Sequence, residues 1–239
     1  TGRTQEIRRL ILQFPVWITC YDMRPSSLFE GVAQRLSILV SQNLTGQENG
    51  LFLGGYRRWA SEERNHLMDL TRFTQIHPAD GVGSLPKFLT PLESSILTKI
   101  VGPVLAQFST ETGEAIYVHR IVRYFVKALN FLPIFKDNGG RKGKSEDYKE
   151  FRFLSADREH ITTLLNSTLF YWFWRSHCDG FHCGYNDVYA TPYKKVTDAT
   201  SRRNLSQLLK QLMNHLKESS VVKKIKSKAG YISYQEFYM

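Results

Sequence analysis

Apolar residues recur at helical spacing in several parts of the chain. The stretch 7–12 has this spacing, and Pro15 ends it because proline cannot continue a helix. We expect two further helices at 59–70, with Ser61 as N-cap, and at 91–105. An aromatic stretch at 161–174 predicts one buried helix. The clearest helix is 201–217, whose apolar stripe consists of Leu205, Leu208, Leu209, Leu212 and Leu216.

Short runs rich in β-branched and aromatic residues predict strands between these helices. Residues 16–20 form one such run, and 36–40 is apolar enough to be buried on both faces. The segment 221–238 predicts a basic hairpin that turns at 229–230. The run 116–124 fits a strand or a helix. This mixture indicates an α+β fold.

The polar, glycine-containing stretch 41–50 is the expected domain boundary. It would separate a first domain, 1–50, from a second, 51–239. The chain opens at Thr1 without an initiator Met and stops just after the predicted hairpin. We therefore expect it to be a piece of a longer protein.

Composition narrows the class of protein. Hydrophobic residues make up 42% and aromatic residues 13%, which excludes a disordered chain. Three cysteines are too few to form the disulfide framework of a small secreted domain, so we expect a reducing, cytoplasmic compartment. No apolar run approaches the roughly 20 residues that span a bilayer, so we expect no membrane partner.

Positive charge is concentrated near the end of the chain. The formal net charge is +10, and 201–228 alone carries eight basic residues against one acid, Glu218. Such a surface attracts phosphates because their neutralisation releases condensed counterions. A solvated helix face would look similar, and charge alone does not separate DNA from RNA or acidic lipid. The basic residues are Arg202, Arg203, Lys210, Lys217, Lys223, Lys224, Lys226 and Lys228.

Catalytic motifs are weak. Neither glycine-rich nucleotide-binding pattern occurs. The crowded set His177, Cys178, His182 and Cys183 lacks the paired spacing of structural zinc sites, so we expect no metal. A second set of residues consists of Asp137, Asp147 and Lys149. Its spacing is similar to the acid-x-Lys arrangement of Mg²⁺-dependent nucleases, so a nuclease stays open as one alternative function. The aromatic content favours a second alternative, an RNA-binding module.

Five segments in order resemble Eco57I-like, type IIG restriction-modification enzymes, which are N6-adenine DNA methyltransferases. These segments are RPSSLFEGVAQRLSILV at 24–40, YRRWASEER at 56–64, NSTLFYWFW at 166–174, DGFH at 179–182 and GYISYQEFY at 230–238. In that family a Rossmann-like domain binds S-adenosylmethionine through a glycine-rich motif, and an Asn/Asp-Pro-Pro-Tyr/Phe motif holds a flipped adenine. Neither motif is present in this chain.

The resemblance therefore implies a division of labour. Residues 5–40 would be the end of the Rossmann-like methyltransferase sheet, and the rest a mixed α/β target-recognition domain. Double-stranded DNA and the rest of the parent methyltransferase would be the partners, in a prokaryotic cytoplasm. The chain itself would bind DNA in a restriction-modification or phage-defence system and catalyse nothing. S-adenosylmethionine would belong to the intact parent, which could also carry a nuclease.

The resemblance also assigns individual residues. Phe29 matches the loop aromatic that packs on the flipped adenine, although a residue that caps the core would suit the same position. Arg24 and Arg35 flank it and would hold phosphates, unless Arg24 pairs with Asp22. The remaining DNA-binding candidates are Arg57, Arg58, Arg64, Arg141, Lys142, Lys144, Arg202, Arg203, Lys223, Lys224, Lys226 and Lys228.

Side-chain chemistry divides these candidates. Arginine and asparagine can read base edges, whereas the hairpin lysines are better suited to phosphates. The aromatic residues Tyr171, Trp172 and Trp174 are expected to lie in the core rather than to stack on bases, because a run of aromatics in an apolar helix needs burial. We expect 179–182 to make a tight turn at Gly180.

Overall fold

The computed structural model describes residues 2–42, 50–76, 85–122, 125–228 and 230–238, and the chain divides into two compact units. The first unit ends at Val101 and the second begins at Gly102. The expected boundary at 50/51 thus lies inside the first unit, because the strand after it pairs with a strand before it. Most of the expected linker, 43–49, lies outside the described residues.

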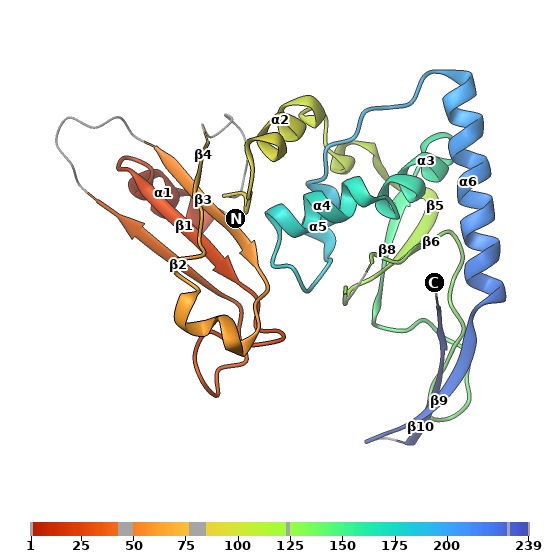
Figure 1. The fold of residues 1–239 in the computed structure, drawn as a ribbon. Coiled ribbons are helices and arrows are strands. Elements are labelled where there is room, and N and C mark those ends of the chain that lie inside the picture. Colours follow the sequence, from red (N-terminus) through yellow and green to blue (C-terminus); the bar gives the residue numbers. More distant parts are fainter. Residues whose placement is uncertain (1, 43–49, 77–84, 123–124, 229, 239) are drawn as a thin grey trace. The chain divides into compact units, whose positions relative to one another are not determined.

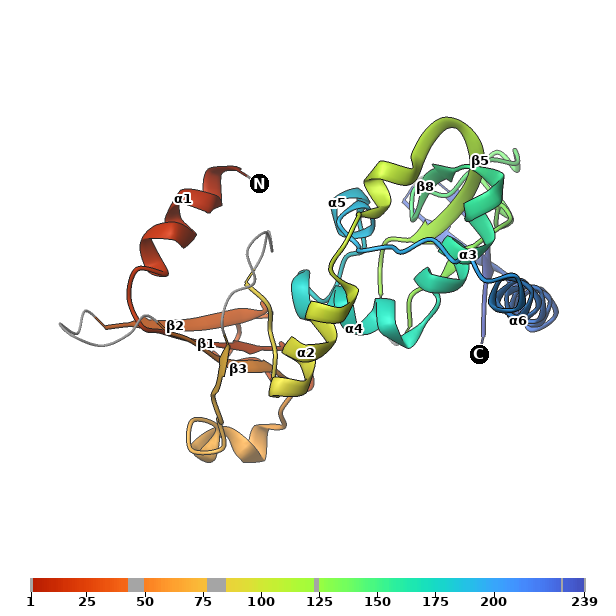
Figure 2. The ribbon, with the colours of Figure 1, turned by 90° about the horizontal axis from the view of Figure 1, so that it is seen from above.

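The first unit contains a four-stranded mixed sheet in the order β2-β1-β3-β4 (Figure 1). The parallel pair is β1 (Val16–Tyr21) with β3 (Leu51–Arg57), and the edge strands β2 (Leu36–Ser41) and β4 (Thr74–Ile76) pair antiparallel. Helix α1 (Gly2–Ile11) lies over one side of this sheet (Figure 2). The helix at 7–12 and the strand at 16–20 are confirmed in type and place. The remaining elements are the 3₁₀ helix η1 (Ser61–His66) and helix α2 (Pro91–Ile100).

Three expectations for this unit are wrong. Strand β2 is apolar but lies at the sheet edge, where Val40 is 55% exposed, so it is not buried on both faces. The helix expected at 59–70 is only the 3₁₀ turn η1, and Ala60 rather than Ser61 precedes it, with its N–H bonded to Glu63. Helix α2 stops at Ile100 because Val101 is extended and Gly102 and Pro103 follow.

The second unit contains two three-stranded sheets. One has the order β6-β5-β8 and the other β7-β10-β9, and all of their pairings are antiparallel. The ambiguous run 116–124 is strand through His119, and its residues 123–124 lie outside the described part. The strands are β5 (Ser109–His119), β6 (Ala128–Leu129), β7 (Phe135–Lys136), β8 (Tyr148–Phe153), β9 (Val221–Ser227) and β10 (Gly230–Glu236).

Four α-helices and one 3₁₀ helix complete the description of the second unit. Helix α6 packs beside α3, and the hairpin β9–β10 follows it in the chain (Figure 1). The clear helix and the basic hairpin are both confirmed, although Ala229 of the turn lies outside the described residues. The helices are η2 (Leu105–Phe108), α3 (Ser155–Leu165), α4 (Thr168–His177), α5 (Tyr185–Tyr189) and α6 (Ala199–Glu218).

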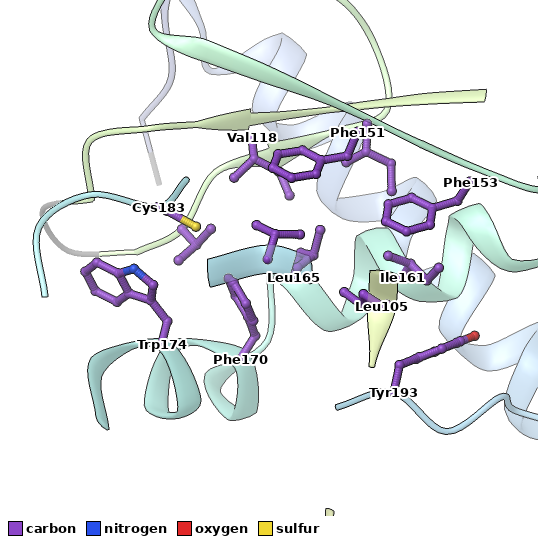
Figure 3. Packing of buried hydrophobic residues seen from close by; sticks show 14 of the residues in the cluster. Leu105, Val118, Phe151, Phe153, Ile161, Leu165, Phe170, Trp174, Cys183 and Tyr193 are labelled. Carbon is purple, nitrogen blue, oxygen red and sulfur yellow. The ribbon is translucent and has the colours of Figure 1, made fainter. Parts of the chain in front are cut away.

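The main core of the second unit lies between the β6-β5-β8 sheet and the helices α3 and α4 (Figure 3). The single helix expected at 161–174 is wrong, since Asn166 and Ser167 break it. The Ser167 hydroxyl caps α4 by accepting the N–H of Phe170, and the Asn166 amide bonds both backbone groups of Ala128. Asn166 thereby ties the helix break to strand β6.

Aromatic residues in α4 and leucines in α6 differ in burial. Trp174 is 2% exposed and donates its indole N–H to the carbonyl of His182 at 2.7 Å, which confirms it as a core residue. Tyr171 and Trp172 are only partly buried. In α6 the buried stripe includes Met213, whereas Leu208 is 57% exposed and does not belong to it.

Among the described residues, no helix combines enough length with enough apolar character to cross a membrane.

Candidate nucleic-acid interface

The β7-β10-β9 sheet carries a face of lysines. Ser233 of β10 lies opposite Lys136 of β7 on one side and Lys224 of β9 on the other, and Lys142 bridges to Lys136. Residues directly opposite in an antiparallel sheet share a face, so these side chains form one row across the strands. Lys226, opposite Tyr231, lies two residues along the same face. We call Lys136, Lys142, Lys224 and Lys226 the lysine face.

The lysine face is exposed and is not neutralised by acids. All four side chains are exposed, and none has an ion-pair partner within the described ranges. The ammonium of Lys224 lies 5.0 Å above the ring of Tyr231, which is itself exposed. Neighbouring strands are about 4.8 Å apart, so the row presents closely spaced charges to solvent. Such an arrangement suits a chain of phosphates.

Two segments far apart in the sequence build this face, and Asp137 positions one of them. Its carboxylate accepts the N–H groups of Gly139 and Arg141, each at 2.9 Å, and the Arg141 guanidinium at 3.0 Å. The N–H of Arg141 holds the pKa of Asp137 below its ordinary value. The basic stretch 138–144 therefore begins with a turn organised by one carboxylate.

The tip of this turn packs on the tip of the hairpin. A Cβ added at Gly230 would lie 3.1 Å from the Cβ of Asn138, and the φ of Gly230 is +128°. Both facts favour glycine at that position. The close approach fixes the loop beside the hairpin.

Four of the other cations predicted in the second unit are engaged elsewhere. Lys223 points to the opposite face and pairs with Glu236, which raises the pKa of this lysine. Lys144 pairs with Glu150 at 2.8 Å, and Arg141 pairs with Asp137. Arg202 donates to the carbonyls of Val196 and Ala156. The remaining two, Arg203 on α6 and Lys228 at the hairpin turn, are exposed.

Lys136 was not among the DNA-binding residues predicted from the sequence. The sequence feature that could have placed it on a strand face is the alternation of Phe135 and Lys136, and a strand of two residues is too short for this period to be recognised.

In the first unit, Asp22 pairs with two of the arginines that were expected to bind DNA. This carboxylate is 1% exposed and lies 3.3 Å from Nε of Arg35 and 2.9 Å from Nε of Arg58. The pairing of Arg24 with Asp22 is therefore wrong, and Arg24 is exposed. Arg57 donates to the Leu70 carbonyl at 2.6 Å. These contacts make Arg35 and Arg58 part of the support for the loop that follows β1, whereas the side chain of Arg57 holds the segment after η1.

The loop after β1 presents Phe29 to solvent. Phe29 is 60% exposed, so within the described structure it does not cap a core. Arg64 donates to the carbonyls of Leu28 and Ser27 at 2.8 and 2.9 Å, and the Ser27 hydroxyl donates to the Phe29 carbonyl. Arg64 thus holds the loop backbone while the aromatic ring points away.

We expect Asp22→Asn to lower the free energy of unfolding by about 2 kcal/mol. Breaking a buried ion pair typically costs 3–5 kcal/mol, and the partial exposure of Arg35 and Arg58 reduces that cost. Urea denaturation followed by tryptophan fluorescence measures the loss. Asp69→Asn is the matched control, because the Asp69 carboxylate is exposed and, among the residues that the structure describes, its ion-pair partner is His66, at 4.0 Å. A loss no larger than that of the control would show that Asp22 does not hold the loop.

The residues considered for metal binding do not assemble. Within the part of the chain that the structure describes, no group of three or more His, Cys, Asp or Glu could hold a metal ion. Asp147 pairs with Arg120 at 3.0 Å, and the Lys149 ammonium lies over the Tyr185 ring. The nuclease alternative thus lacks a carboxylate cluster among these residues.

The expected tight turn at Gly180 is confirmed. Gly180 has φ +75°, and the Asp179 carboxylate accepts the N–H groups of Phe181 and His182, both at 2.7 Å. The His182 ring also contacts that carboxylate, and burial raises the pKa of the Cys183 thiol. This group is structural, since it presents the His182 carbonyl to Trp174.

Comparison of the chain with protein-family models, with curated proteins and with solved structures finds no match. The geometry therefore defines only a class: a mixed α+β protein whose second unit presents an exposed, uncompensated lysine face.

Proposed function

We propose that this chain binds double-stranded DNA as the sequence-recognition part of an N6-adenine DNA methyltransferase of a restriction-modification or related defence system. The observation that carries the binding proposal is the lysine face. It gathers four cations from two distant segments, with no acid in the row. The assignment to a methyltransferase rests on the resemblance of the five segments described above.

The proposal gives the two units different roles. The lysine face would contact phosphates, and exposed cations such as Arg203 and Lys228 would extend that contact. In the first unit, the exposed ring of Phe29 would stack on an extruded adenine, with Arg24 beside it on a phosphate. S-adenosylmethionine and the catalytic tetrapeptide are assigned to the rest of the parent protein, because this chain lacks the motifs that would hold them.

Salt-dependent binding tests the proposal. Fluorescence anisotropy with a labelled duplex should show tight binding at 50 mM salt and a loss of roughly 10²-fold at 200 mM, as expected for about four phosphate contacts. Binding that is weak at 50 mM or insensitive to salt would contradict it.

Competition distinguishes DNA from RNA on the same instrument. We expect an unlabelled duplex to displace the labelled one more effectively than single-stranded RNA of equal length does. The reverse order would favour the RNA-binding module. Nicking of a plasmid that is lost in Asp147→Ala would favour the nuclease.

A further inference from the structure

The other face of the lysine-bearing sheet lines a cavity of about 520 Å³. Side chains alternate along β10, so Tyr231 and Ser233 lie on the lysine face while Ile232 and Tyr234 line the cavity. The rest of the lining includes His119 of β5, Tyr148 of β8 and residues of the segments next to these strands. Cavities of this size hold small organic ligands in many proteins.

The cavity is suited to a flat ring. Aromatic side chains form much of its lining, which includes Phe125, Phe135, Tyr148 and Tyr234. The hydroxyls of Tyr148 and Tyr234 have no hydrogen-bond partner among the residues that the structure describes, so each can donate to or accept from a ligand. Stacking on aromatic rings favours every nucleobase, because each base has a π-face.

His119 adds an imidazole ring to the cavity. Its Nδ1 lies 2.8 Å from the carbonyl oxygen of Ile121 and 3.3 Å from the backbone nitrogen of the same residue, so the backbone engages Nδ1 and Nε2 is the ring nitrogen left for a ligand. Burial lowers the pKa of His119 and keeps the ring neutral. The charged groups that act on His119 include Lys127 and the carboxylate of Asp147, which pairs with Arg120, and Glu236 of β10 also lines the cavity. A neutral imidazole and two tyrosine hydroxyls in one cavity are groups that can hydrogen-bond the amino and ring nitrogens of a base.

We propose that this cavity holds one unstacked nucleobase of the nucleic acid whose backbone lies on the lysine face. The proposal rests on the proposed function, because the lysine face would deliver the base. Lys224 and Lys226 lie on β9, the edge strand of the sheet. A backbone held there can pass around this edge and direct a base to the other face. The base can come from an opened duplex or from a single strand.

Binding to matched probes tests the cavity. The probes are a duplex with one bulged nucleotide, a single strand, and abasic copies of both that keep every phosphate. We expect the probes that carry the base to bind about tenfold tighter than their abasic copies at 50 mM salt. Equal affinity would overturn the proposal. A base effect in the bulged duplex assigns the base to an opened duplex, and an effect in the single strand alone assigns it to a single strand.

Two variants locate the effect within the molecule. Tyr234→Leu removes a stacking ring and Ile232→Trp fills the cavity, so each should abolish the tenfold difference while affinity for the abasic probes stays unchanged. Tyr231→Leu, on the other face of the same strand, is the control and should leave the difference intact. If both cavity variants keep the difference, the base binds elsewhere and the proposal fails. If no probe binds at all, the proposed function fails with it.

Discussion

Reversing the charge of Lys136, Lys224 and Lys226 to glutamate is expected to lower affinity for duplex DNA by roughly 10²-fold at 50 mM salt. The three lysines share one sheet face, so each reversal removes a phosphate contact and adds a repulsive charge. The slope of log affinity against log salt should become shallower by about 2.7, that is about 0.9 for each lost contact. Anisotropy at several salt concentrations measures both quantities.

The control for this variant has the same change in charge at another place. Reversal of Lys99, Lys194 and Lys210, all exposed, also takes the formal net charge from +10 to +4. We expect it to weaken binding much less, because these residues are not on the lysine face. Equal losses in the two triple variants would mean that net charge, rather than the row of lysines, determines binding.

Trp174→Ala is expected to lower the free energy of unfolding of the second unit by about 4 kcal/mol. Large-to-small changes of buried aromatics typically cost 3–5 kcal/mol, and this side chain is 2% exposed among Phe170, Leu165 and Cys183 (Figure 3). The change also leaves the His182 carbonyl without its indole donor. Urea denaturation of the full chain, followed by circular dichroism, measures the loss.

Two further variants separate packing from hydrogen bonding. Trp174→Phe keeps most of the ring but removes the donor, so we expect a loss of about 1–2 kcal/mol. Trp172→Ala should cost less than Trp174→Ala, because Trp172 is only partly buried. A Trp174→Ala protein that keeps its stability but loses nucleic-acid binding would show that this ring stacks on bases after all.

Local patterns predicted the elements whose signal lies within one segment. The helix at 201–217 and the hairpin at 221–238 follow from periodicity and turn residues, and the structure confirms both. The prediction for 161–174 failed because Asn166 has its main partner, Ala128, 38 residues away. Apolar composition alone could not show that β2 is an edge strand, since the order of strands depends on the whole fold.

The candidate interface was predicted less well than the fold. Counting charges identified the hairpin, but it treated Lys223 and Lys224 alike, and only the pairing of β9 with β10 places them on opposite faces. The arginines near Asp22 looked free because the carboxylate that pairs with Arg35 and Arg58 is distant in sequence. Charge predicts where cations are plentiful, whereas tertiary contacts decide which of them remain accessible.

Strand β10 lies in a sheet with the lysine face on one side and the cavity on the other. This arrangement constrains how the hairpin can change during evolution. Insertion of a single residue between Gly230 and Tyr234 would move every later side chain of the strand to the opposite side. Tyrosine and isoleucine would then meet water, and serine would enter an aromatic cavity. Homologous hairpins should therefore differ in length by even numbers of residues, or compensate for an odd change with a bulge.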